Sequence, residues 1–297
     1  MAGGHDVTVL TRDLRKVDVL AHPVRVIDSL DRVHSADRFD AIVNLAGDAV
    51  ASGLWTAKKR ARIVDSRVDM TRALDALIGR LDVKPGVFIN GSAVGYYGLH
   101  GDDILAEDAE PNPAFVHDVC RAWEDAAAPI ARHGVRVVVL RIGLVLGVDG
   151  GMLAKLLTPF EFGAGGRMGD GQQWMPWIEH SDMVRVIAFA IASDIEGPVN
   201  ATAPIPVRNA TFTADLAAAL HRPVFLRFPA WLLGLLGDMG RETMLGGQRV
   251  VPVKLLDAGF HFDHDTLGPM LSQITGAKGA PLHLTAERLK MPEPSRV

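Results

Sequence analysis

The sequence has a single cysteine and no concentration of charge of either sign. Cys120 stands alone among 297 residues, so no disulfide can form within the chain, and we expect a reducing compartment, the cytoplasm. Lys and Arg number 31 against 35 Asp and Glu, a formal net charge of -4, and no basic segment is interleaved with aromatic residues. A nucleic-acid groove needs such a segment, so we expect no nucleic-acid partner.

Long apolar runs are also lacking. The most apolar stretch, residues 228–236, contains Pro229 and Gly234, and it is far shorter than the about 20 residues that a membrane-spanning helix requires. The first residues show no basic segment followed by an apolar core, the pattern of a secretory signal. We therefore predict that residues 228–236 form a buried helix and that the protein has no membrane partner.

What is present is enough apolar material for a large core, 48% hydrophobic residues against 22% charged ones. Through the first half, short β-branched runs alternate with longer stretches that carry apolar residues at helical spacing, which is typical of a parallel sheet wrapped by helices. Such connections give right-handed crossovers. Strands are expected at 7–10, 24–27, 41–45, 87–90 and 135–140, and helices at 57–79 and 114–133.

The second half is richer in glycine and predicts a smaller domain interleaved with the first. Helices are expected at 182–192, 211–220 and 253–258, with Asp182 and Thr211 as N-caps because their side chains can accept a hydrogen bond from a free amide. We predict a nucleotide-binding part over 1–147, incomplete at its N-terminus. A substrate-binding and small C-terminal α/β part follows over 148–277, and a flexible tail over 278–297.

The glycine loop of a dinucleotide-binding fold is missing from the start of the sequence. Such a fold needs glycines between its first strand and first helix, so that the backbone can approach a pyrophosphate. The first expected strand ends in Thr11-Arg12, like a second strand, and only six residues precede it, where a complete first unit needs about 20 more. We expect a sheet that lacks its first strand, through a late chain start or in a form that binds nucleotide poorly. The glycine cluster at 163–169 predicts a loop, since Met168 takes the place of its last glycine.

The ends of two expected strands suit a cofactor. An Arg at the end of the second strand of such a fold accommodates a 2′-phosphate, so Arg12 favours NADP, and the alternative is a solvated surface Arg. After the strand at 41–45, the small residues Ala46 and Gly47 allow a ligand to lie against the backbone.

Hydroxyl groups follow the strand at 87–90. Ser92 could hydrogen-bond a substrate oxygen, and Tyr96 or Tyr97 could move a proton, whereas the alternative is an ordinary turn with packing aromatics. Cys120 is expected to be a small buried helix residue rather than a nucleophile. The 11 His residues show no ligand spacing that indicates a metal, so we predict none.

The order of several motifs resembles the epimerase family of extended short-chain dehydrogenases, in the branch of cell-division-inhibitor-like nucleoside-diphosphate-sugar epimerases. The motifs are VTVLTR, NLAG, SAVGYYG, VCRAWE, LRIGLVLG, QWMPWIEHSDMV and GPVNATAP, and GQRVVPVKLLDAGFHF resembles the small C-terminal domain of this branch. The resemblance implies a Rossmann-like α/β fold, a parallel sheet with helices on both faces, here lacking the first strand and the glycine-rich loop. It also implies NADP as cofactor, with NAD as the alternative, although the missing loop puts binding in question. Contacts to the cofactor are implied for Thr11, Arg12, Leu45, Ala46, Gly47, Arg67 and Leu144.

One departure from the family pattern concerns catalysis. A standard member places a Tyr and a Lys four residues apart on one helix, and those positions here are Val116 and Cys120. Ser92 is retained, and Tyr96 or Tyr97 would have to supply the proton.

Two functions follow from this pattern. The first is an NADP-linked oxidoreductase or epimerase acting on a small carbonyl or nucleotide-sugar-like substrate. The second is a dinucleotide-binding or scaffold protein whose catalytic pair has decayed. A homodimer is a further expectation.

Overall fold

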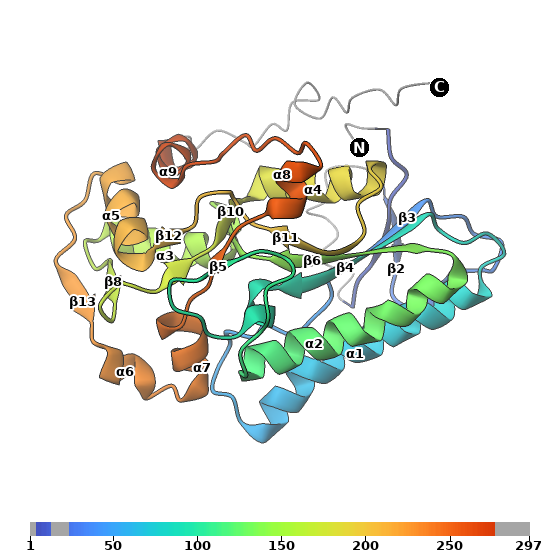
Figure 1. Ribbon diagram of the computed structural model, residues 1–297, viewed down its shortest axis with the longest axis horizontal. Helices are drawn as coiled ribbons and strands as arrows, with labels where there is room; N and C mark the ends of the chain where they lie inside the picture. Colours follow the sequence, from blue (N-terminus) through green and yellow to red (C-terminus); the bar gives the residue numbers. More distant parts are fainter. Residues whose placement is uncertain (1–3, 13–23, 277–297) are drawn as a thin grey trace.

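The computed structural model describes residues 4–12 and 24–276, and the predicted tail lies outside these residues (Figure 1). Its centre is a four-stranded parallel sheet in the order β11-β6-β4-β3. The strands are β3 (Ala41–Asn44), β4 (Val87–Ala93), β6 (Arg136–Ile142) and β11 (Gly197–Ala201). The two inner strands consist largely of Val, Ile and Leu and are mostly buried, as expected of parallel strands covered on both faces.

A second, two-stranded ladder stands beside this sheet. β1 (Thr8–Leu10) runs parallel to β2 (Arg25–Ile27), with Thr8 opposite Arg25. Within the described residues no strand pairing joins β1 to β3. Leu10 and Ile27 nevertheless pack in one apolar cluster with Ile42 of β3, so the ladder belongs to the same core. The described sheet is divided where the sequence predicts a missing strand.

Helices cover both faces of the sheet. In Figure 1, α1 (Ala57–Arg80) and α2 (Phe115–Ala127) lie together below it, and α4 (His180–Ala192) and α8 (Val253–Asp257) lie above it. α1 begins at Thr56, whose hydroxyl accepts a hydrogen bond from the amide of Lys59. α2 approaches β4 so closely that a Cβ added at Gly91 would lie 2.8 Å from the ring of Trp123. The predicted Rossmann-like α/β fold is confirmed.

The second half contributes small ladders and short helices. An apolar cluster that includes Met175 and Trp177 forms its core. The ladders are β5 (Ile104–Leu105) with β14 (Arg249–Val250), β7 (Leu144–Gly147) with β10 (Trp177–Glu179), β8 (Gly166–Met168) with β13 (Leu226–Phe228), and β9 (Trp174–Met175) with β12 (Val207–Arg208). The remaining helices are α3 (Gly151–Glu161), α5 (Asn209–Ala219), α6 (Ala230–Gly234), α7 (Asp238–Gly240) and α9 (Leu267–Gly276), with 3-10 turns at Leu30–Arg32, Val94–Tyr97 and Ala128–His133 and a π-turn at Arg241–Leu245.

Several local predictions were wrong. Residues 166–168 of the glycine cluster form β8, because β13 supplies a partner strand that the local sequence does not reveal. The stretch at 228–236 is not buried: Trp231 is 70% exposed and Leu235 71%. Pro229 and Gly234 bound a helix of only five residues, too short to lay a continuous apolar face on the core.

The predicted N-caps of two helices were also wrong. The side chain of Glu179 caps α4, and Asp182 is already inside the helix. Arg208 precedes α5, which places Thr211 in its first turn. No described helix is both long enough and apolar enough to cross a membrane.

Candidate functional site

Five of the predicted cofactor residues follow two strands: Thr11 and Arg12 come after β1 of the two-stranded ladder, and Leu45, Ala46 and Gly47 come after β3 at the edge of the four-stranded sheet. The amide of Thr11 donates to the carbonyl of Ile27 at 3.0 Å, and Arg12 follows with an exposed side chain. At the end of β3, Leu45 is 52% exposed. Open α/β sheets bind ligands beyond the carboxyl ends of their strands, so both segments are candidates for such a site.

A buried amide that sequence reasoning missed holds the turn after β3. The side-chain amide of Asn44 donates to Thr71 Oγ1 at 3.0 Å and to Asn90 Oδ1 at 2.8 Å, while its oxygen accepts from the backbone of Ala46 at 3.2 Å. All polar atoms of this amide are therefore used to position the turn. Asn44 ends β3 and pairs in register with Asn90, which lies inside β4. This pairing depends on tertiary structure, so no local sequence pattern indicated it.

Arg67 of α1 lies directly against the same turn. Its Nη1 donates to the carbonyls of Asp48 at 3.0 Å and Ile63 at 2.9 Å, and its guanidinium lies 5.0 Å from the ring centre of Trp123. A Cβ at Gly47 would lie 2.7 Å from the Arg67 guanidinium carbon, so the glycine permits this approach. Burial lowers the pKa of Arg67 below its ordinary value.

Leu144 lies in a different ladder from these residues. It opens β7, opposite Trp177 of β10, and its amide donates to the carbonyl of Pro176 at 2.8 Å. Its side chain packs against the apolar core of the second half. The structure thus brings Arg67 to the turn at Leu45–Gly47 and leaves Leu144 in a separate environment.

Ser92 belongs to a buried charged network. Its hydroxyl donates to Glu124 Oε1 at 2.6 Å, and Arg141 binds both oxygens of the same carboxylate, at 3.1 Å and 3.0 Å. The side chains of Arg141 and Glu124 are only 4% and 14% exposed. Burial opposes the charge of Arg141, but its hydrogen bonds and ion pair with Glu124 raise its pKa above the ordinary value.

The two tyrosines differ in how much freedom they retain. Tyr97 is fully buried, its hydroxyl donates to Asn200 Oδ1 at 2.7 Å and accepts from Arg141 Nη1 at 3.1 Å, and burial raises its pKa to about 12. Tyr96 is half-buried, with the Arg141 guanidinium carbon 3.4 Å from its ring centre. Of the two phenols, only that of Tyr96 is partly accessible.

Cys120 is a buried helix residue, as predicted. Its Sγ lies 3.6 Å from the carbonyl of Ala93, and burial raises the pKa of its thiol to about 11. A Cβ at Gly95 would lie 3.1 Å from Val116 Cβ and 3.7 Å from Cys120 Sγ. The helix positions where a standard family member has Tyr and Lys therefore pack against the turn that carries Tyr96.

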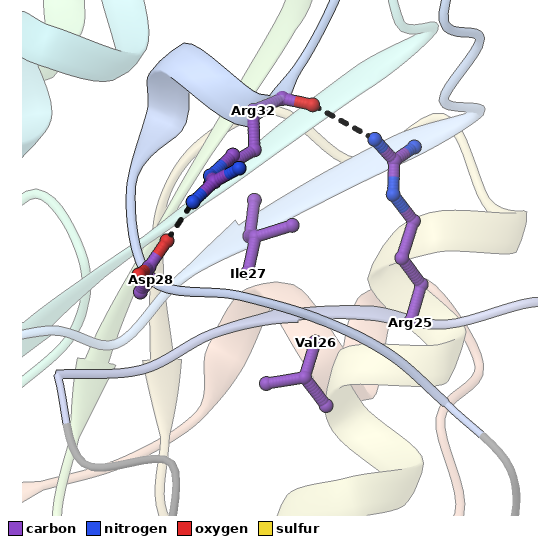
Figure 2. A pocket seen from close by; sticks show the side chains of 5 residues that line it. All are labelled: Arg25, Val26, Ile27, Asp28 and Arg32. Carbon is purple, nitrogen blue, oxygen red and sulfur yellow. Dashed lines mark hydrogen bonds and ion pairs between the residues drawn. The ribbon is translucent and has the colours of Figure 1, made fainter.

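A pocket opens along β2, the strand whose Ile27 carbonyl accepts the amide of Thr11. Figure 2 shows its lining residues, with the Arg25 guanidinium directed at the carbonyl of Arg32 and Arg32 paired with Asp28. These contacts measure 2.9 Å and 3.5 Å, and Arg25 also pairs with Asp37 at 3.2 Å. Because both cations of the pocket are already engaged, and none of the predicted site residues lines it, we assign it no ligand.

The fold and these strand ends define a Rossmann-like α/β protein. The model of the NAD dependent epimerase/dehydratase family matches residues 1–202, and that of a domain of unknown function, DUF1731, matches residues 228–274. The chain therefore belongs to the NAD dependent epimerase/dehydratase family, which confirms the resemblance seen in its motifs.

Relatives in sequence and in structure extend over most of the chain. The epimerase family protein YfhF of Bacillus subtilis is 34% identical over 91% of this chain and 90% of its own length, and Mb2239 of Mycobacterium bovis is 39% identical over 83% and 82%. The human epimerase family protein SDR39U1, solved with NADPH, has a TM-score of 0.82 at 28% identity, covering 93% of this chain and 92% of its own. The UDP-glucose 4-epimerase of Thermotoga maritima, solved with UDP-glucose, has a TM-score of 0.75 at 19% identity over 92% and 91%, a likeness of fold alone.

Proposed function

We propose that this protein binds NADP and transfers hydride between the cofactor and a small carbonyl or nucleotide-sugar-like substrate. The observation that carries the proposal is the position of Thr11-Arg12 and of Leu45, Ala46 and Gly47. Both groups follow the carboxyl ends of strands, β1 of the small ladder and β3 at the edge of the central sheet, and these strands share one apolar cluster. NADPH in the human relative supports the same cofactor. Residues 1–147 would then hold the cofactor and 148–277 the substrate.

The described residues fit the adenosine half of the cofactor. Arg12 is exposed and offers a guanidinium for a 2′-phosphate, and the open apolar side chain of Leu45 offers a surface for the adenosine. Within the described residues, no glycine-rich turn supplies amides for the pyrophosphate. Measured affinity therefore tests this half of the proposal directly.

Bound cofactor would supply a hydride to a carbonyl carbon or, in the reverse direction, accept one from an alcohol carbon. In the reducing direction, Tyr96 would give its phenolic proton to the carbonyl oxygen, so that the carbonyl becomes an alcohol. The Arg141 guanidinium carbon lies 3.4 Å from the centre of the Tyr96 ring and would hold the ring in position. Ser92 would orient the substrate oxygen by turning its hydroxyl from Glu124 to the substrate.

A second candidate function is nucleotide binding without turnover. The observation that favours it is the closed network around Arg141, which occupies the hydroxyls of both Ser92 and Tyr97. Val116 and Cys120 stand in place of the usual Tyr and Lys, and of the two tyrosines only Tyr96 is partly exposed.

The test combines binding with turnover. NADPH and NADH are titrated by calorimetry, and NADPH oxidation is followed with a panel of aldehydes, ketones and nucleotide-linked ketosugars. We expect NADPH to bind more tightly than NADH, with Arg12→Ala reducing this preference about tenfold. Turnover that falls in Tyr96→Phe and survives in Tyr97→Phe supports the enzyme. Binding without turnover supports the second function, and no binding overturns both.

A further inference from the structure

A compact group of buried side chains lies on the face of the sheet covered by α4. Glu179 ends β10 and caps α4, Asp182 lies in the first turn of α4, and His264 comes from the segment between α8 and α9. Their side chains are 9%, 0% and 9% exposed. One possible ligand atom from each lies within 4.8 Å of the others.

The imidazole of His264 points into this group without a hydrogen-bond partner among the described residues. Its buried Nδ1 lies 3.5 Å from Asp182 Oδ2 and 3.7 Å from Glu179 Oε2. Both distances exceed those of ordinary hydrogen bonds, and a buried polar nitrogen is rarely left unsatisfied. This nitrogen is therefore available to bind a further group.

The spacing matches the edges of a metal coordination tetrahedron. Zinc binds His nitrogen and carboxylate oxygen at about 2.0 to 2.2 Å, and a tetrahedron with such bonds has edges of about 3.3 to 3.6 Å. The separations of His264 Nδ1 from the two carboxylate oxygens, 3.5 Å and 3.7 Å, are close to such edges, and the two oxygens lie within 4.8 Å of each other.

The electrostatic balance also favours a cation. Arg185 binds the opposite oxygen of Asp182, Oδ1, at 2.7 Å, which leaves Oδ2 directed at His264. The backbone amide of His264 donates to this Oδ2 at 2.9 Å and fixes its orientation. Glu179 Oε2 accepts from the amide and hydroxyl of Ser181 and from the amide of Asp182 at 3.2 Å, so a cation would have to displace at least the hydroxyl. Arg185 also pairs with Asp263 at 3.0 Å, so one guanidinium faces three carboxylates and the group has a net negative charge.

We propose that Glu179, Asp182 and His264 form a zinc site that fastens the segment between α8 and α9 to the start of α4. Three protein ligands would leave the fourth position of tetrahedral zinc to a water. The site is independent of the proposed reaction, because none of its ligands is among the proposed cofactor or catalytic residues. Zinc binding would replace the missing partner of His264 Nδ1.

The experiment uses the full chain without an affinity tag, stripped with chelator and titrated with zinc chloride by calorimetry. We expect one zinc ion per chain and a rise in thermal midpoint with zinc. His264→Gln and Glu179→Gln should each weaken binding at least about tenfold, since loss of even an outer-shell partner typically costs about 10- to 100-fold. The matched control is His261→Gln, an exposed histidine of the same segment whose Nδ1 already lies 2.8 Å from the carbonyl of Gly259.

Three results would overturn the proposal. They are absence of stoichiometric zinc in the native chain, unchanged affinity in His264→Gln, or an equal loss in His261→Gln. Should a variant misfold by circular dichroism, substitution of the native chain with cobalt decides. The intense visible absorption of four-coordinate cobalt supports the site, and its absence contradicts it. NADPH binding is measured in parallel, so failure of the zinc site stays separate from failure of the proposed function.

Discussion

Arg141 combines more interactions than any other residue near the proposed site. It binds both oxygens of Glu124, donates to the Tyr97 hydroxyl and to the carbonyl of Glu107, and covers the ring of Tyr96. A planar guanidinium can do this, whereas an ammonium group cannot. The residue therefore connects β6, α2 and the turn after β4 through one buried side chain.

We predict that Arg141→Met lowers the free energy of unfolding by about 3 to 5 kcal/mol, because it leaves the Glu124 carboxylate buried without its partner. Urea unfolding followed by circular dichroism measures this loss. The control is Arg121→Met, which removes an exposed pair with Asp125 and should cost less than about 1 kcal/mol. Similar losses in both variants would contradict the structural role of Arg141.

Tyr97 should make stability depend on alkaline pH. Its pKa is about 12 in the folded chain and about 10 when unfolded. The folded state thus holds the proton longer, so this contribution is complete below pH 10 and is lost as pH rises toward 12. We expect the difference in unfolding free energy between the native chain and Tyr97→Phe to shrink by about 1 kcal/mol from about pH 8 to about pH 11. A constant difference would contradict the assignment.

The starts of two helices, α1 and α5, predict different effects for two threonine substitutions. We predict that Thr56→Ala, which removes the N-cap of α1, lowers the free energy of unfolding by about 1 kcal/mol. Thr211→Ala should change it by less than about 0.5 kcal/mol, because Thr211 is an exposed residue inside α5 rather than its cap. Thermal or urea unfolding of both variants measures the contrast, and the opposite ranking would count against the observed helix starts.

Elements with a regular apolar period were predicted well. The expected helix at 57–79 is Ala57–Arg80, and the expected strand at 41–45 is Ala41–Asn44, because each buries one side against the core. The structural role of Asp182 could not be predicted from the neighbouring sequence. Its carboxylate accepts the amides of Asp263 and His264, 81 and 82 residues further along the chain, so its function as a loop anchor depends on tertiary structure.

In the candidate site too, some features were predictable from the local sequence and others depended on tertiary structure. The turn that carries Tyr96 was predictable, since a parallel strand is followed by a turn at its carboxyl end. Ser92 was predicted to follow a strand at 87–90, but it lies inside β4, which extends to Ala93 because its pairing with β6 continues to Ile142. The hydrogen bond of the Tyr97 hydroxyl could not be predicted, because its acceptor Asn200 lies 103 residues away in the sequence. The cofactor and catalytic assignments remain predictions.

For the whole molecule, the divided sheet should give unequal local stability. β4 is paired on both sides, by β3 and β6, whereas β1 and β2 form a ladder of two short strands. We predict that amides of β1 and β2 exchange with deuterium at least about 100-fold faster than those of β4 and β6, as measured by mass spectrometry. Equal protection would mean that the small ladder is as stable as the central sheet.

Glu107 has a consequence for how the molecule unfolds. One oxygen of its buried carboxylate accepts the amides of Asn200 at 3.0 Å and Lys254 at 3.2 Å, and its carbonyl accepts from Arg141 at 2.9 Å. A residue of the first half thus binds both β11 and the start of α8. Of these two elements, α8 lies within the DUF1731 match. Because these hydrogen bonds join the central sheet to the C-terminal region, the two should unfold together. Calorimetry should accordingly record one cooperative heat-absorption peak, and proteolytic removal of the C-terminal region should melt the central sheet as well.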